Sequence, residues 1–305
     1  MEALEHRRVL ATFLVTSAAD VVDNNDGVLT LREAVNLAND STGSDSILFH
    51  DDLFSQATEI SLEQGPLEIS DSLRVTGPGQ HLLTIDGQHL SQLFVVDTTS
   101  AADLTLQGLT LASGKTSDPI APGGAVHFSS DGTLTIHLAT VRDNETLGLG
   151  SHGGAVYVSR GNLIVSDSTF VRNRTHGGDS AGGAVFVDRG ALLIESSQFA
   201  ENQTQGSGSL GGAIFSSGAT ISVERALFEN NATFGSSADG GAIYASGGAT
   251  LRSSRLTGNA TMGDESDGGA LFASTYLSLR QSDFSFNETQ GDDSAGGAIV
   301  TDGAT

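Results

Sequence analysis

The chain has 305 residues, with 37 Asp and Glu against 14 Lys and Arg, and a formal net charge of -23. Such an acidic surface repels nucleic acid and anionic membranes, so we expect no nucleic-acid partner and a preference for cations or basic partners. The chain has no Cys, which excludes disulfides and thiolate metal sites, and it has no apolar run of about 18 residues, so we expect no membrane insertion within it.

The N-terminus admits two interpretations. Arg7 and Arg8 precede a short apolar run, Val9 to Val15, which is at the lower limit for the core of a signal peptide. We prefer Phe13 to Thr16 as the first strand of a cap. The segment Leu4 to Ala11 also resembles the Leu-Glu-x-Arg-x-Leu-Leu motif near the start of many very large bacterial surface proteins.

Residues 30 to 40 predict a short amphipathic helix. Thr30 and Glu33 are spaced as a capping box, and the apolar residues from Leu31 to Ala38 fall on one helical face. Such a helix can cover the open end of a stacked β core, which would otherwise present unpaired strand edges. The stretch Leu29 to Val35 resembles the core of the CSLREA domain, which precedes β-helix repeats in secreted bacterial proteins, although that family's leading Cys is missing here.

The turn before this helix is rich in Asp and Asn. Asn24, Asp26 and Glu33 occupy positions 3, 5 and 12 of an EF-hand-like loop, which makes calcium the one cofactor that the sequence suggests. Position 1 would be Val22, which cannot ligate a cation. This mismatch favours the alternative, an Asx-rich turn followed by a capped helix.

From residue 46 to residue 122, apolar pairs such as Leu83 and Ile85 are separated by Gly, Pro, Asp and Asn. Such pairs predict strands, and their irregular spacing is typical of the terminal coils of a repeat protein. We therefore expect a cap over residues 1–45, irregular coils over 46–122 and regular coils over 123–305. Because residue 305 falls inside a fresh repeat, we expect the coils to continue beyond it.

The tripeptide Gly-Gly-Ala recurs at intervals of 30, 29, 29, 29, 28 and 28 residues. A period of this size predicts a repeat architecture, in which each unit buries its apolar face only by stacking on the next. Each unit continues through short apolar segments to a Phe-x-x-Asn-x-Thr motif. The tripeptide starts at Gly123, Gly153, Gly182, Gly211, Gly240, Gly268 and Gly296.

Equivalent positions of successive units carry similar residues. Leu134, Leu163 and Leu192 share one position, and the next buried position follows two residues later. This pattern indicates parallel strands stacked in register. We predict an all-β fold, a right-handed parallel β-helix with three short strands per coil of about 29 residues and a short N-terminal capping helix. About ten coils spaced by about 4.8 Å would form a rod.

Six Asn-x-Thr triplets match the acceptor sequence for N-glycosylation. All six occupy the same position of the repeat, which favours a structural cause. Stacked Asn side chains can hydrogen-bond one another along the axis and satisfy buried turn carbonyls. The predicted ladder consists of Asn144, Asn173, Asn202, Asn231, Asn259 and Asn287.

Gly-Gly-Ala followed by Val, Ile or Leu, paired with Phe-x-x-Asn, is the repeat pair of the chlamydial-type polymorphic membrane proteins. Residues 123–305 resemble that repeat, with seven instances of the first motif and six of the second. The family consists of secreted surface proteins, several of them adhesins. The resemblance therefore implies a role at the bacterial surface.

After each Gly-Gly-Ala, an aliphatic residue is followed by one that is usually aromatic, and the two must face opposite sides of the strand. We assign the aliphatic residues to the core, which places the aromatic ones outside as a possible binding stripe for sugar rings or a partner protein. The alternative is that the aromatic residues fill the core. The stripe comprises His127, Tyr157, Phe186, Phe215, Tyr244 and Phe272.

Acidic residues gather in the loops before Gly-Gly-Ala. We interpret them as solvated charges that keep the rod soluble, with weak calcium bridging between loops as the alternative. They are Asp118, Asp179, Asp239, Asp264, Glu265, Asp267, Asp292 and Asp293.

A polysaccharide lyase or hydrolase is the main rival hypothesis. These enzymes need two converging carboxylates, or a base beside stabilising cations. The acids recur with the repeat, and the sequence indicates no Arg or Lys group beside a carboxylate set. We therefore expect no enzyme, because active sites are where a repeat pattern breaks.

The sequence thus predicts a noncatalytic, exported rod at the bacterial cell surface, which binds along its lateral faces. The expected partner is an extracellular polysaccharide or a surface protein of a host or neighbouring cell. Two alternatives stay open: a carbohydrate-active enzyme with its catalytic coil in residues 46–122, and a calcium-stiffened spacer.

Overall fold

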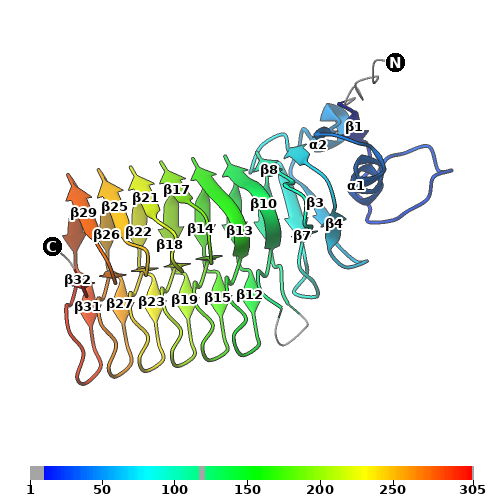
Figure 1. Cartoon of the computed structure of the whole chain (residues 1–305). Coiled ribbons are helices and arrows are strands. Elements are labelled where there is room, and N and C mark those ends of the chain that lie inside the picture. The colour runs from blue at the N-terminus through cyan, green and yellow to red at the C-terminus, as the bar shows by residue number, and fades with distance from the viewer. Residues whose placement is uncertain (1–9, 117–120, 304–305) are drawn as a thin grey trace, which may run out of the picture.

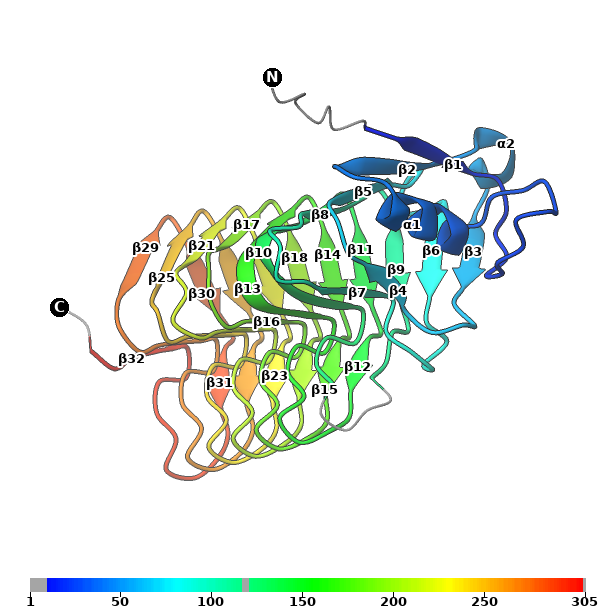
Figure 2. The ribbon, with the colours of Figure 1, turned by 45° about the vertical axis from the view of Figure 1, so that its right-hand side comes forward.

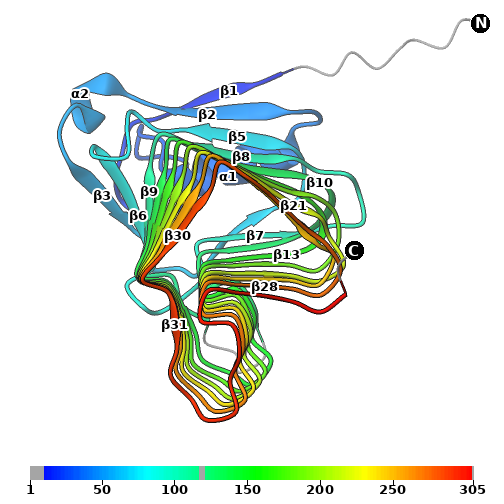
Figure 3. The ribbon, with the colours of Figure 1, turned by 90° about the vertical axis from the view of Figure 1, so that its left-hand side faces the viewer.

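The computed structural model describes residues 10–116 and 121–303 (Figure 1). These residues form a parallel β-solenoid of about nine turns with three parallel sheets and two helices, which confirms the predicted fold class. Figure 3 looks along the rod with the C-terminal end in front, and the chain winds anticlockwise toward the viewer, as in a right-handed helix. Asp118 and most of the segment Leu4 to Ala11 lie outside the described residues.

An N-terminal cap closes one end of the rod. Strand β1 (Thr12–Val15) pairs in parallel with β2 (Asp45–Phe49), and helix α1 (Leu31–Asp40) lies across the end of the coils (Figure 2). The capping box is confirmed: Thr30 Oγ1 accepts from the backbone N–H of Glu33, whose carboxylate accepts from that of Thr30. The buried face of α1 covers the first coil, and a short helix, α2 (Asp51–Phe54), follows β2.

The early coils are built from short strands at the places where the sequence shows apolar pairs. In all of these strands except β9, whose three residues are all buried, buried residues alternate with less buried ones, so one face is turned to the core. The strands are β3 (Thr58–Ser61), β4 (Leu67–Ile69), β5 (Leu73–Thr76), β6 (Leu83–Asp86), β7 (Phe94–Asp97), β8 (Leu104–Gln107) and β9 (Thr110–Ala112).

The first two regular coils contribute three strands each to three sheets, and the next four coils contribute four strands each. In the first two coils, the strand after Gly-Gly-Ala is a single long strand of the 17-stranded sheet. In later coils it is divided into two short strands, which both stay in that sheet. This refines the expectation of three strands per coil. The segments are β10 (Val126–His137), β13 (Val156–Ser166), β16 (Val185–Val187), β17 (Leu192–Glu195), β20 (Ile214–Ser216), β21 (Ile221–Glu224), β24 (Ile243–Ala245), β25 (Ala249–Arg252), β28 (Leu271–Ala273), β29 (Leu277–Arg280) and β32 (Ile299–Thr301).

The other two sheets take one strand each from the first six regular coils. The 9-stranded sheet contains β11 (Thr140–Arg142), β14 (Thr169–Val171), β18 (Gln198–Ala200), β22 (Leu227–Glu229), β26 (Arg255–Thr257) and β30 (Asp283–Ser285), together with β3, β6 and β9. The 6-stranded sheet contains β12 (Glu145–Thr146), β15 (Arg174–Thr175), β19 (Gln203–Thr204), β23 (Ala232–Thr233), β27 (Ala260–Thr261) and β31 (Glu288–Thr289).

The core consists of side-chain columns that run along the axis. The pairing register aligns Leu163 with Leu192 and Leu192 with Ile221, and all three are buried. The aromatic position of the Phe-x-x-Asn motif also points inward. Phe170, Phe199 and Phe228 stack with ring centroids 4.8 and 5.0 Å apart, so neighbouring coils lock together through like side chains.

The Gly-Gly pair is required by close backbone approach. Gly182 has φ +72°, and a Cβ there would lie 2.2 Å from the carbonyl oxygen of Val185. A Cβ on Gly183 would lie 2.1 Å from the carbonyl oxygen of Gly212 in the next coil. Any larger residue at Gly183 would therefore separate the coils, which explains why the motif recurs.

Candidate functional site

The six Asn side chains form a continuous amide ladder. Nδ2 of Asn173 donates to Oδ1 of Asn202 at 2.9 Å and to the carbonyl oxygen of Val141 at 3.0 Å. The same Oδ1 accepts from the backbone N–H of Asn173 at 3.0 Å. The pattern repeats from Asn144 to Asn287, and the first five side chains are fully buried. These five amides are therefore inaccessible to glycosylation in the folded chain.

The Thr of each Asn-x-Thr triplet also has a structural partner. Thr204 Oγ1 donates to the carbonyl oxygen of Ser209 at 2.8 Å, and Thr175 makes the same contact with Ser180. Both Thr residues are buried. These bonds hold the loops that follow the 6-stranded sheet, which Figure 3 shows as a flat projection from one corner of the rod. We call this projection the loop wing; it comprises residues 147–152, 176–181, 205–210, 234–239, 262–267 and 290–295.

The predicted stripe lies on the outer face of the first strand segment of each coil, while its aliphatic neighbours face the core. Val156 and Val185 are fully buried, and Tyr157 and Phe186 point to the opposite side. From Tyr157 to Phe272 the rings stack with centroids 4.9 to 5.3 Å apart and interplanar angles of 1° to 19°. His127 meets Tyr157 edge-on at 5.4 Å.

This stacking limits how the stripe can bind. The rings present their faces to one another along the axis, so a sugar cannot stack on a ring face within the column. Phe186 and Phe272 are 6% and 8% exposed, whereas His127, Tyr157, Phe215 and Tyr244 are half-buried. The column therefore offers ring edges and the polar groups of Tyr and His to a ligand.

The loop wing borders this column. His152, in the wing, stacks on Phe186 with a centroid distance of 4.2 Å, and its Nδ1 accepts from the backbone N–H of Ala181. Burial lowers the pKa of both His152 and His127, although nearby Asp side chains act in the opposite direction. Burial, together with Asp188, raises the pKa of Tyr157. These groups are thus kept neutral, which suits hydrogen bonding more than charge pairing.

Acidic residues of the loop wing bond to the next coil. Asp239 Oδ1 accepts from the backbone N–H of Asp267 at 2.7 Å, and Asp264 Oδ1 accepts from that of Asp292 at 2.9 Å. Burial, and secondarily the charge of Asp267, raises the pKa of Asp239. Some of these carboxylates therefore connect the coils in addition to carrying charge.

The proposed calcium loop is organised around Glu33. Its Oε1 accepts from the backbone N–H of Asp23 at 2.6 Å, and its Oε2 accepts from that of Thr30 at 2.9 Å. Asp26 accepts from the backbone N–H of Val28, as in an Asx turn. Among the described residues, Asn24 makes no hydrogen bond to the carboxylate of Asp26 or Glu33. In the described part of the chain, no three His, Cys, Asp or Glu side chains are grouped to hold a metal ion. Calcium binding here stays a prediction.

One expectation about charge is wrong. The structure brings Arg142 and Arg172 onto Asp143, and Lys115 and His176 onto Glu145. This group could not be recognised from the sequence alone, because its members come from neighbouring coils. The signal was present, since Arg142 and Arg172 flank the ladder Asn in successive repeats and become neighbours once the coils are aligned.

One segment of the regular coils is similar to a known protein repeat. Residues 226–246 match the family model of the Chlamydia polymorphic membrane protein repeat. No curated protein matches the chain, and no solved structure does. Within residues 10–116 and 121–303, no helix is long and apolar enough to span a membrane. The matched segment contains β22, β23 and β24, and the neighbouring coils align with it in register. The other regular coils therefore share the architecture of the segment that resembles this repeat.

Proposed function

We propose that this chain is a noncatalytic rod of a bacterial surface protein, exported and displayed so that its lateral face binds a partner. The match to a repeat of surface-associated proteins supports the location. The partner that we favour is an extracellular polysaccharide, with a protein of another cell's surface as the second candidate. Solenoids typically bind along their extended faces.

The observation that carries this proposal is the unbroken register of the columns. The outer aromatic column continues from His127 to Phe272 without a gap, and Val300 takes the next position. A face that repeats every coil suits a repeating polymer or an extended contact, because each coil offers the same group at the same spacing.

The ligating groups of this face would be polar. Tyr157 and Tyr244 are half-buried, and their rings are held by stacking, so their hydroxyls are oriented at little entropic cost. A polysaccharide supplies hydroxyl groups that can pair with them. The acidic loop wing beside the column disfavours a densely anionic polymer.

The enzyme hypothesis has one observation in its favour, the meeting of Arg and carboxylate side chains near Asp143 and Glu145. Their ion pairs and hydrogen bonds lower the pKa of both carboxyl groups in spite of burial. A glycosidase needs a carboxylic acid with a raised pKa as proton donor. This cluster is therefore better suited to binding than to acid catalysis.

A binding and turnover assay tests the proposal. Immobilised acidic and neutral polysaccharides are incubated with the chain, and both retained protein and released sugar ends are measured. We expect retention without new sugar ends. Product formation would contradict the noncatalytic role, and retention on no polysaccharide would exclude the favoured partner.

Conservative variants locate the binding face. Replacing Tyr157 and Tyr244 by Phe removes two hydroxyls and leaves the stack intact, so retention should fall at least about fivefold. Tyr276→Phe is the matched control, because Tyr276 is 43% exposed and lies outside the column. Equal retention by all variants would show that the aromatic column is not the contact face.

A further inference from the structure

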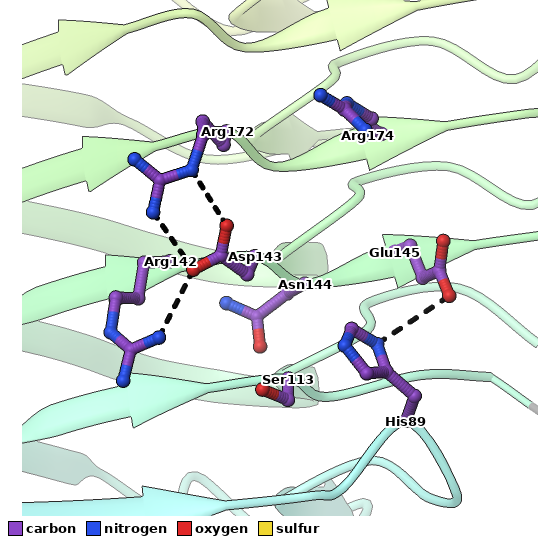
Figure 4. A pocket seen from close by; sticks show the side chains of 8 residues that line it. All are labelled: His89, Ser113, Arg142, Asp143, Asn144, Glu145, Arg172 and Arg174. Atoms are coloured by element: carbon purple, nitrogen blue, oxygen red, sulfur yellow. Dashed lines mark hydrogen bonds and ion pairs between the residues drawn. The ribbon is translucent and has the colours of Figure 1, made fainter.

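The first two regular coils carry a pocket of about 430 Å³ beside the Asn ladder (Figure 4). Its lining includes Arg142, Arg172, Arg174, Asp143, Glu145 and His89. We call it the basic pocket. Its volume lies within the usual range for small-ligand sites, roughly 300 to 1,000 Å³, and so exceeds the needs of a single ion.

Basic side chains are concentrated at the basic pocket, although the chain as a whole is strongly acidic. Arg142, Arg172 and Arg174 line the pocket, and Lys115, the only lysine of the chain, pairs with Glu145 at its edge at 2.9 Å. These are four of the 14 basic residues. They outnumber the carboxylates of Asp143 and Glu145 even when Glu201, whose charge acts on Arg172, is included.

Two of the Arg side chains are fixed by one carboxylate. Arg172 Nε and one terminal nitrogen lie 2.8 and 3.0 Å from the two oxygens of Asp143, and Arg142 reaches the same carboxylate at 3.0 Å (Figure 4). Arg172 is thus held as a rigid fork. Since one carboxylate cannot saturate two guanidinium groups, several N–H donors stay free for a ligand.

Arg174 is the Arg of the basic pocket whose guanidinium lacks a hydrogen-bond partner among the described residues. Its Nε is buried and has no hydrogen-bond partner among the described residues, and no ion pair joins its guanidinium to them. It lies on β15, one coil from Glu145 on β12, and in the same coil as Arg172. A buried donor without an acceptor is unfavourable, and an incoming oxyanion would satisfy it.

We propose that the basic pocket binds an oxyanion group, carboxylate or sulfate, carried by a sugar, with Arg174 as its main donor. The unpaired guanidinium N–H groups of the pocket attract the oxyanion, and the fixed guanidinium of Arg172 orients it. The rest of the pocket volume accommodates the sugar ring. His89 and His176 border Glu145 and complete the polar wall. The inference rests on the proposed function only in taking an extracellular glycan as the ligand.

The basic pocket suits a ligand that carries one or a few negative charges, because the rest of the chain is acidic. The charges at the pocket itself are those of Arg142, Arg172, Arg174 and Lys115 against the carboxylates of Asp143 and Glu145. A uronic acid residue or a single sulfate ester therefore meets a positive site, whereas a densely sulfated polymer would meet the negative surface around it.

The test uses the whole chain and trigalacturonate as the probe, with its fully methyl-esterified form and inorganic sulfate at matched ionic strength as the other arms. The Nε–H signals of the Arg side chains are followed by NMR during each titration. We expect trigalacturonate to shift the Arg174 signal and the neutral ester to leave it unchanged. A shift with inorganic sulfate alone would overturn the sugar ligand and leave an adventitious ion only.

Arg174→Gln should weaken trigalacturonate binding at least tenfold. Arg189→Gln is the matched control, because Arg189 is 73% exposed and pairs only with Asp188 among the described residues. Unchanged affinity in Arg174→Gln, with the fold intact by circular dichroism, would overturn the proposal. Failure here leaves the result for the Tyr variants standing, and cleavage of the probe would instead contradict the noncatalytic role.

Discussion

The Nδ2 amide of Asn173 donates a hydrogen bond to Oδ1 of Asn202, and the backbone N–H of Asn173 donates to the same oxygen. Each internal amide of the ladder thus uses both N–H donors and both lone pairs without water. Because the alternative is a buried unsatisfied group, the ladder fixes the register of one coil on the next.

Asn231→Ala should destabilise the chain by about 3 kcal/mol, because it removes four hydrogen bonds and orphans buried partners on Phe199, Asn202 and Asn259. The adjacent Asn230→Gly is the control: Asn230 has φ 55°, and Gly258 occupies the equivalent position one coil later. Urea unfolding measures both. Similar losses for the two variants would argue against the ladder.

Thr204→Val should loosen one loop of the wing and leave the rod intact. The change keeps the shape of the side chain and leaves the carbonyl oxygen of Ser209 without its donor, at a cost of about 1 kcal/mol. Hydrogen exchange in residues 205–210 should accelerate. Thr250→Val, on the outer face of β25, should leave these amides unchanged; if both variants behave alike, the Thr–Ser contact is not what holds the wing.

Phe186→Ala should cost about 3 kcal/mol, because Phe186 is 6% exposed and stacks on Tyr157, Phe215 and His152. Phe286→Ala is the contrast, because Phe286 is 89% exposed, and we expect a change within about 0.5 kcal/mol. Thermal unfolding of both variants compares them. A small effect at Phe186 would mean that the column is an open surface in solution.

Acid should weaken the fold below the ordinary pKa of His. Burial lowers the pKa of His127 and His152 below the ordinary His value of about 6.5, so the unfolded chain binds more protons as the pH falls below that value. Stability therefore declines from about pH 6.5 downward and levels off only when the folded His residues protonate.

The double variant His127→Phe and His152→Phe keeps aromatic packing and removes these protonation sites. Its stability should fall less than that of the parent as the pH drops below about 6.5. The free energy of unfolding is measured at several pH values. An unchanged pH slope in the double variant would contradict the burial of these two rings.

The sequence could predict the columns because each coil repeats them. Leu163, Phe170 and Asn173 each have a like residue about one period later, and strand stacking then places them together. The helix at Leu31 could also be predicted, since its capping box is local.

What could not be predicted depends on contacts between unlike positions. Thr204 contacts Ser209 across a loop whose path no periodicity specifies. His152 covers Phe186 because the loop wing folds back toward the strand, which decides how exposed the aromatic column is. The basic pocket arises where Arg174 departs from the Gln or Ala found at its position in the next coils, and only aligned coils reveal its neighbours.

The central claim is that neighbouring coils stack residue on residue, and pairwise disulfide formation tests it most directly. The chain has no Cys, so only introduced pairs can react. Ser222 and Thr250 are register partners on adjacent coils, within the Cα separation of about 4.4 to 6.8 Å that a disulfide spans. Ser222 and Ser278 are two coils apart, about 9.6 Å. We expect the first cysteine pair to oxidise to a disulfide and the second not to; equal reaction of both pairs, or of neither, would contradict residue-on-residue stacking.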